Sequence, residues 1–137
     1  MRAIKYIAVH CTATAQTATV ENIKNYWREH LGWQKPGYHF IVQPDGTVVK
    51  LLPIEEVSNG VAGYNSVTIN VSYIGGIDKK GAPKDTRTQA QKDSLIEILS
   101  DLKKQFPKAQ IQGHRDFPKV KKACPSFDAK TEYQHIK

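Results

Sequence analysis

Short runs of hydrophobic and β-branched residues mark candidate strands in the first half and middle of the chain. One run spans residues 3–10, and another spans residues 67–74 ahead of a Gly-Gly pair. Both favour β-structure and are bounded by polar or glycine-containing segments, as expected for buried strands. Residues 37–43 and 47–51 flank Pro44-Asp45-Gly46, a turn signal that predicts a hairpin.

Two further segments have the period of amphipathic helices. Thr19 is placed to cap a helix that Gly32 ends, with apolar positions at Val20, Ile23, Trp27 and His30 or Leu31. Thr88 and Gln91 form a capping box ahead of a helix that stops before Pro107. One face of that helix consists of Leu95, Ile98, Leu99, Leu102 and Phe106. A short strand at residues 109–112 then follows.

Strands interleaved with helices predict an α/β or α+β protein, in which a central mixed β-sheet is flanked by helices. The order of the strands stays open. The length of 137 residues fits a single domain, residues 1–137, built on one core. Hydrophobic residues make up 39% and charged residues 24%, which is ordinary for a globular protein and argues against a disordered chain.

Targeting signals and net charge limit the class of protein further. The N-terminal segment lacks the apolar stretch and cleavage site of a signal peptide, and no apolar run is long enough to cross a bilayer. We therefore expect a protein without a transmembrane segment that stays in the cytoplasm of the producing cell until it is released. The net charge of +7 favours polyanionic partners but fits a solvated basic face equally well. Because no nucleic-acid-binding motif accompanies the charge, we expect no specific nucleic-acid partner.

The segment 113–128 contains the strongest chemical signal. It places His114 and Cys124 ten residues apart, with Lys122 two positions before the cysteine. Imidazole and thiolate are ligand types that zinc prefers, and two of them on one short segment supply half of a tetrahedral site. A disulfide between Cys11 and Cys124 is the alternative use of the two cysteines, which we do not expect without a secretion signal.

A third ligand must come from another segment, and His10 at the end of the first predicted strand is a candidate. His30 and His135 lie at a helix end and near the C-terminus, where side chains are poorly held. Strand alternation separates His10 from Cys11, so Cys11 is interpreted as a buried apolar residue rather than a ligand. Pattern alone leaves His10 either as a ligand or as a core histidine.

Four segments together resemble the type-2 N-acetylmuramoyl-L-alanine amidases. They are AVHCTAT around His10, PGYHFIVQPDGTV around Tyr38, GYNSVTINVSYIGGID, and GHRDFP followed by KACPSFD. The likeness is greatest to the amidase-type phage lysozymes, or endolysins, which are related to the peptidoglycan recognition proteins. It implies a zinc hydrolase that cleaves the amide bond between N-acetylmuramic acid and L-alanine in bacterial peptidoglycan, in a phage or prophage endolysin.

The resemblance also implies which residues act. The zinc ligands carried over are His10, His114 and Cys124, and the catalytic residues are Tyr38 and Lys122. Three protein ligands leave the fourth position of Zn²⁺ open for water, which is typical of a catalytic site. Donors beside the carbonyl oxygen and proton relays both lower the barrier to amide hydrolysis, and the sequence does not divide these roles between Tyr38 and Lys122. The alternatives are a core tyrosine and a solvated lysine.

Several supporting contacts are expected around this site. Alternation along the predicted strand puts Tyr38 and His39 on opposite faces of the sheet. We expect Asn65 to hydrogen-bond the glycopeptide and Trp33 to stack on a sugar or an alkyl chain. Three side chains are available to orient the histidine ligands, namely Thr12, Asp116 and Asp128.

Two other functions compete with a simple amidase. The first is a non-catalytic peptidoglycan-binding module, although such relatives typically lack the cysteine ligand that this chain retains. The second is an amidase that also inhibits a phage RNA polymerase, for which no interface is evident in the sequence. For the enzyme itself we expect a monomer, with a holin-type partner that gives it access to the cell wall.

Overall fold

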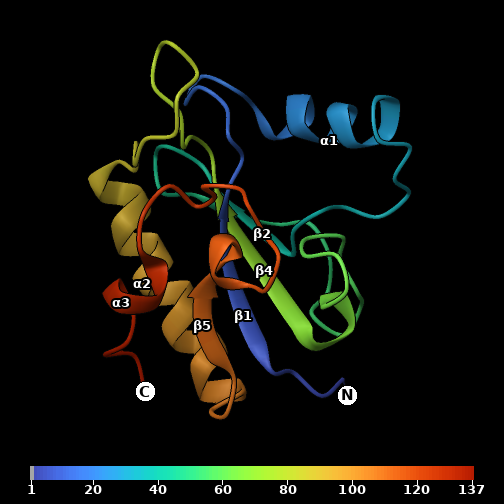
Figure 1. Ribbon diagram of the computed structural model, residues 1–137, viewed down its shortest axis with the longest axis vertical. Coiled ribbons are helices and arrows are strands. Elements are labelled where there is room, and N and C mark those ends of the chain that lie inside the picture. Colours follow the sequence, from blue (N-terminus) through green and yellow to red (C-terminus); the bar gives the residue numbers. More distant parts are fainter. Residues whose placement is uncertain (1) are drawn as a thin grey trace.

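The computed structural model describes residues 2–137, which form a five-stranded mixed sheet with helices packed on it (Figure 1). The strands are β1 (Tyr6–Cys11), β2 (Phe40–Val42), β3 (Val48–Lys50), β4 (Thr68–Tyr73) and β5 (Gln110–Gly113), in the spatial order β3-β2-β4-β1-β5. Strand β1 is parallel to both β4 and β5, and β2 is parallel to β4. The β2–β3 hairpin is antiparallel. The predicted α+β class with a mixed sheet is therefore confirmed.

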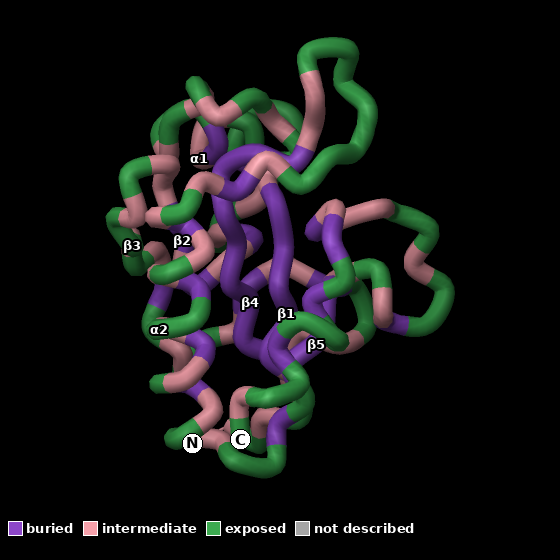
Figure 2. The backbone as a smooth tube through the Cα atoms, turned by 90° about the vertical axis from the view of Figure 1, so that its left-hand side faces the viewer, coloured by how far each residue is buried: buried purple, intermediate pink, exposed green. Residues whose placement is uncertain are grey.

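The two central strands, β1 and β4, are buried along nearly their whole length (Figure 2). One face of the sheet packs against α2 (Gln89–Gln105) and the short α3 (Ala129–Glu132), and this layer contains the largest hydrophobic cluster. Its fully buried members include Ile7, Val9, Ile69, Val71, Leu95 and Leu99. Because side chains alternate along a strand, the residues between them, such as Ala8, His10 and Asn70, lie on the opposite face.

Helix α1 (Val20–Glu29) covers one end of that opposite face. It lies apart from α2 and α3, beyond the ends of β1 and β4 (Figure 1). Ile23 and Trp27 of α1 are buried against Ile41 and Ile74. The helix thereby forms a separate apolar wall at the edge where β1 and β4 end.

Both predicted helix caps are present. Thr19 forms a capping box with Asn22, and Thr88 forms one with Gln91. The fully buried Gln91 side chain also donates hydrogen bonds to the carbonyls of Val42 and Ile74, at 3.1 and 3.0 Å. A cap recognised from local sequence thus also fastens α2 to the ends of two strands.

The structure differs from the sequence prediction in three places. Strand β1 begins at Tyr6 rather than at residue 3, and the helix α3 was not predicted. Strand β2 begins at Phe40, so Tyr38 and His39 precede it and strand alternation does not separate them. The expectation that they occupy opposite faces was wrong, because both contact groups on the face that carries His10. Within residues 2–137, no helix combines the length and hydropathy needed to span a membrane.

Candidate metal and catalytic site

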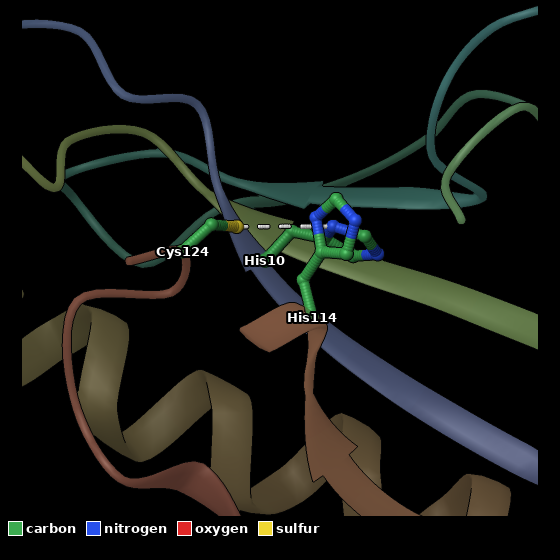
Figure 3. Close-up of side chains that lie close together, drawn as sticks. All are labelled: His10, His114 and Cys124. Carbon is green, nitrogen blue, oxygen red and sulfur yellow. Dashed lines mark hydrogen bonds between the residues drawn. The ribbon is translucent and has the colours of Figure 1, made fainter. Parts of the chain in front are cut away.

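The side chains of His10, His114 and Cys124 converge at one end of the sheet (Figure 3). His10 lies on β1, His114 begins the short 3₁₀ helix His114–Asp116 directly after β5, and Cys124 lies on the loop that follows. Because β1 and β5 are neighbouring parallel strands, their ends meet at the same edge of the sheet. The nitrogen and sulfur atoms that could bind a metal all lie within 4.8 Å of one another.

The loop bearing Cys124 is fixed by backbone contacts at both strand ends. The backbone N–H of Cys11 donates to Cys124 Sγ at 3.2 Å, and the N–H of Arg115 donates to the Cys124 carbonyl at 2.9 Å. The next residue, Pro125, packs against Gly113, where a Cβ atom would lie only 2.7 Å from Pro125 Cδ. Glycine at this position therefore lets the loop close over the end of β5. The Cys11 side chain itself is buried in the main core, as alternation predicted.

Burial and nearby charge keep both histidines neutral. Burial, the neighbouring His114 and Lys122 lower the pKa of His10 from 6.5 to about 3. Burial and Lys122 lower the pKa of His114 to about 4. At neutral pH each ring therefore has an unprotonated nitrogen that can bind a metal.

The Cys124 thiol is held in its protonated form by its surroundings. The neighbouring Cys11 thiol and burial raise the pKa of Cys124 above its ordinary value. A bound divalent cation would stabilise the thiolate form of Cys124, and its binding would release the thiol proton. Two neutral imidazoles and one thiol within ligand distance of each other fit a zinc ion well.

These three residues lie in a cavity of about 670 Å³. Tyr38 and Lys122 also line it, so the structure brings all five residues of the predicted chemical site together. One wall is formed by α1 and the segment after it, where the rings of Trp27 and Trp33 stack with centroids 6.4 Å apart. Trp33 is thus on the cavity wall, as a substrate contact requires.

Tyr38 contacts the metal-ligand cluster directly. Its hydroxyl donates to the Cys11 carbonyl at 3.2 Å, and its ring centroid lies 5.0 Å from that of His10. Burial, together with the nearby Cys124, raises the pKa of Tyr38 above its usual value. The phenol therefore stays protonated and acts as a hydrogen-bond donor.

Asn65 is not placed with the other predicted residues. Its Oδ1 accepts a 2.7 Å hydrogen bond from the backbone N–H of Val61, and the side chain does not line the cavity. From the same loop, Asn59 and Gly60 line the cavity instead. At the cavity this loop thus presents two residues that belong to no recognisable motif, and not Asn65.

The residue that orients His10 was missed by sequence reasoning. Asn70 Oδ1 lies 2.8 Å from His10 Nε2, and both side chains are buried. The candidates named from the sequence have other partners. Thr12 Oγ1 accepts from the Gly75 backbone, Asp116 accepts from the Gly113 backbone, and Asp128 caps α3. The only local signal for Asn70 was a polar residue in the middle of a β-rich run.

The chain matches the family model of the N-acetylmuramoyl-L-alanine amidases over residues 1–127. It is 43% identical to the endolysin of Klebsiella phage KP32 over 126 residues, which is 90% of this chain and 82% of that protein. It is 40% identical to the endolysin of Escherichia phage T7, with the same coverage of both chains.

Solved structures show the same fold. The Ph2119 endolysin from the Thermus scotoductus MAT2119 bacteriophage Ph2119 superposes with a TM-score of 0.78 at 28% identity, over 91% of this chain and 79% of that one. The fold, the possible metal site formed by three side chains and the cavity around it define a peptidoglycan amidase. The chain belongs to the N-acetylmuramoyl-L-alanine amidase family.

Proposed function

We propose that this chain is a phage-type endolysin that hydrolyses the amide bond between N-acetylmuramic acid and L-alanine, using Zn²⁺ held by His10, His114 and Cys124. The observation that supports it most is the convergence of these three side chains, with ligand atoms within 4.8 Å, on a cavity in a chain of the amidase family. The whole chain, residues 1–137, serves as one catalytic domain.

The protein supplies the ligands in the form that zinc requires. Both imidazoles are neutral at physiological pH because burial lowers their pKa values. Cys124 would bind as a thiolate, with its sulfur already accepting the N–H of Cys11. When bound, Zn²⁺ supplies a Lewis acid that polarises the amide carbonyl and makes water nucleophilic near neutral pH.

Lys122 and Tyr38 divide the remaining work according to their positions. Lys122 is exposed and lines the cavity, and its ammonium group can donate to the carbonyl oxygen as negative charge develops there. Tyr38 is protonated and lies beside His10, and its single proton is donated to the Cys11 carbonyl in the free protein. On turning to bound substrate, the hydroxyl would instead donate this proton to the attacking water or the leaving nitrogen. A raised pKa makes Tyr38 unsuited to act as a general base.

The cavity wall provides the substrate-binding surface. Trp33 offers an aromatic face on which a sugar ring can stack, and the exposed Tyr26 extends this wall. Asn59 and Gly60 on the facing loop are placed to contact the stem peptide. Asn65 contributes indirectly because its side chain holds that loop in shape. The net charge of +7 would draw the enzyme toward an anionic cell envelope.

The proposed setting is the cell wall of an infected bacterium, which the enzyme reaches after release from the cytoplasm. The matching phage proteins are endolysins, and this is the basis for assigning the same role. A monomeric state and a membrane-permeabilising partner of the holin kind stay predictions from the sequence.

Digestion of purified sacculi tests this function. Mass spectrometry should detect intact stem peptides with a free L-alanine amino group and glycan strands with unsubstituted muramic acid. A chelator should abolish both products, and added Zn²⁺ should restore them. Cleavage within the glycan or within the stem peptide, with no free L-alanine terminus, would refute the proposed bond specificity.

A further inference from the structure

Behind His10 lies a buried chain of hydrogen bonds that ends far from the cavity. His10 Nε2 lies 2.8 Å from Asn70 Oδ1, and Asn70 Nδ2 donates to Ser58 Oγ at 2.7 Å. Ser58 Oγ lies 3.2 Å from His39 Nδ1, and His39 Nε2 lies 2.7 Å from the Glu56 carbonyl. His10 is 1% exposed, and Ser58, His39 and Asn70 are completely buried.

At the far end of this series of hydrogen bonds, the partners of His39 determine which of its ring nitrogens carries the proton. The backbone N–H of Asn70 donates to His39 Nδ1 at 3.0 Å, so this nitrogen is an acceptor. The proton of a neutral His39 must then be on Nε2, where it is donated to the Glu56 carbonyl. Because Nδ1 has a single lone pair, the Ser58 hydroxyl, 3.2 Å away, is only a second and weaker donor to it.

The amide of Asn70 links Ser58 to His10. Its NH₂ group donates a 2.7 Å hydrogen bond to Ser58 Oγ. The amide oxygen of Asn70 therefore faces His10 and requires a proton on Nε2. The other ring nitrogen, Nδ1, then keeps its lone pair on the side where Cys124 Sγ lies 3.9 Å away.

Packing fixes the position of the Asn70 amide group. Gly60 lies directly against the Asn70 amide, so a Cβ atom at position 60 would overlap the amide group. Gly60 is also part of the cavity lining, so the same loop that borders the cavity presses on the residue behind His10. Among residues 2–137, every buried side-chain nitrogen and oxygen has a hydrogen-bond partner, and both ends of the Asn70 amide do.

We propose that Asn70, Ser58 and His39 are positioning residues that force His10 into the Nε2–H tautomer, which leaves Nδ1 free to bind the metal. The inference rests on the proposed zinc site, but it concerns a property that the metal-free protein already has. Reversal of the Asn70 amide would place the proton of His10 on Nδ1, the atom that faces the other ligands. These hydrogen bonds therefore preorganise His10 for metal binding, because the tautomer and ring orientation of a metal-bound histidine depend on the partner of its second nitrogen.

Long-range ¹H–¹⁵N correlation spectra of the histidine rings in the metal-free protein test the proposal without requiring catalysis. At neutral pH the wild-type His10 should show a protonated Nε2 and an unprotonated Nδ1. Asn70→Asp keeps an acceptor toward His10 and should preserve this tautomer. Asn70→Leu and Ser58→Ala should yield a mixture of tautomers. A matched control is Ser66→Ala, which removes an exposed hydroxyl from the same loop and should change nothing.

Zinc affinity, measured by competition with a chromophoric chelator, provides a second readout. Asn70→Leu should weaken binding by about 10- to 100-fold, and Ser58→Ala should weaken it less, while Ser58→Thr restores it. A wild-type His10 protonated on Nδ1 would overturn the proposal, as would a tautomer unchanged in both Asn70→Leu and Ser58→Ala. If wild-type protein binds no zinc but shows the Nε2–H tautomer, the proposed zinc site fails while the positioning chain stands.

Discussion

The backbone N–H of Cys11 lies 3.2 Å from the sulfur of Cys124 and donates to it. The two residues are 113 positions apart in sequence, and Cys11 directly follows His10 on β1. The end of β1 therefore carries one candidate ligand, His10, and the next backbone N–H donates a hydrogen bond to a second candidate ligand, Cys124. The Cys11 thiol belongs to the hydrophobic core and is not one of the grouped ligand residues, although it lies near Cys124 and raises the pKa of that thiol.

Replacement of the two cysteines should separate their roles. Cys124→Ser should remove bound zinc and amidase activity, because a hydroxyl is a far poorer zinc ligand than a thiolate. Cys11→Ala should retain one zinc per chain, at a stability cost of roughly 1–2 kcal/mol for a small buried side chain. Metal analysis of the purified variants checks both expectations. If Cys11→Ala lost zinc and Cys124→Ser retained it, the zinc ligand would be Cys11 and the proposed assignment to Cys124 would be wrong.

Lys122 should affect the chemical step rather than metal binding. Lys122→Ala is expected to lower kcat by about 10²–10³-fold with zinc content unchanged, as for removal of a donor to the developing oxyanion. Lys121→Ala is the matched control, because that side chain is exposed and does not line the cavity. Initial rates on a soluble muropeptide give the comparison. Equal rates for the two variants would show that Lys122 is only a solvated lysine.

Tyr38 should act through its hydroxyl while protonated. Tyr38→Phe should reduce kcat by about 10²-fold and leave KM nearly unchanged, because a transition-state hydrogen bond is lost while the ring remains. Tyr6→Phe, whose ring packs on Tyr64 and Phe117, is the control and should retain activity. Burial raises the pKa of Tyr38, so the phenol should stay protonated near pH 10. The wild-type rate should therefore not fall near pH 10 through ionisation of Tyr38, and Tyr38→Phe should have the same pH profile in that range. Such a loss would mean that the phenol ionises during turnover.

The metal-free protein should lose stability as the pH falls below 6.5. Burial lowers the pKa of His10 to about 3, so the unfolded chain binds a proton between these values and the folded chain does not. Stability is thus fully present above pH 6.5 and declines toward pH 3, by about 1.4 kcal/mol per pH unit for His10 well inside this window. The lowered pKa of His114, about 4, and the lowered pKa of His39 act in the same direction.

Urea unfolding in the presence of a chelator at pH 7, 6 and 5 measures this dependence. His10→Gln should show a shallower decline, because one of the buried neutral histidines is gone. A stability that is flat or that rises from pH 7 to pH 5 would contradict neutral burial of His10.

Sequence patterns were sufficient for features that depend on neighbouring residues. Both helix caps, the hairpin around Pro44-Asp45-Gly46 and the apolar face of α2 follow from residues within one turn or one loop. The burial of Cys11 also followed, because alternation along a regular strand fixes the direction of each side chain. Alternation failed at Tyr38 and His39 because these residues lie before the regular part of β2.

Contacts between distant segments could not be predicted in this way. The partner of His10 is Asn70 on β4, and Asn70 is oriented by Ser58 and His39 from two further segments. This arrangement depends on the order β2-β4-β1, which parallel pairing does not reveal in local sequence. Residue types and spacing indicated His114 and Cys124, but His10 was selected as the third ligand only because a family resemblance supplied the long-range relationship between β1 and the C-terminal loop.

Zinc K-edge X-ray absorption of the loaded protein tests the central claim most directly, because it counts the ligand types at the metal. The account predicts one zinc per chain with a single sulfur at about 2.3 Å and two imidazole nitrogens at about 2.0–2.1 Å. The sulfur should vanish in Cys124→Ser and persist in Cys11→Ala. A spectrum with two sulfurs, or with none, would contradict a site made of His10, His114 and Cys124.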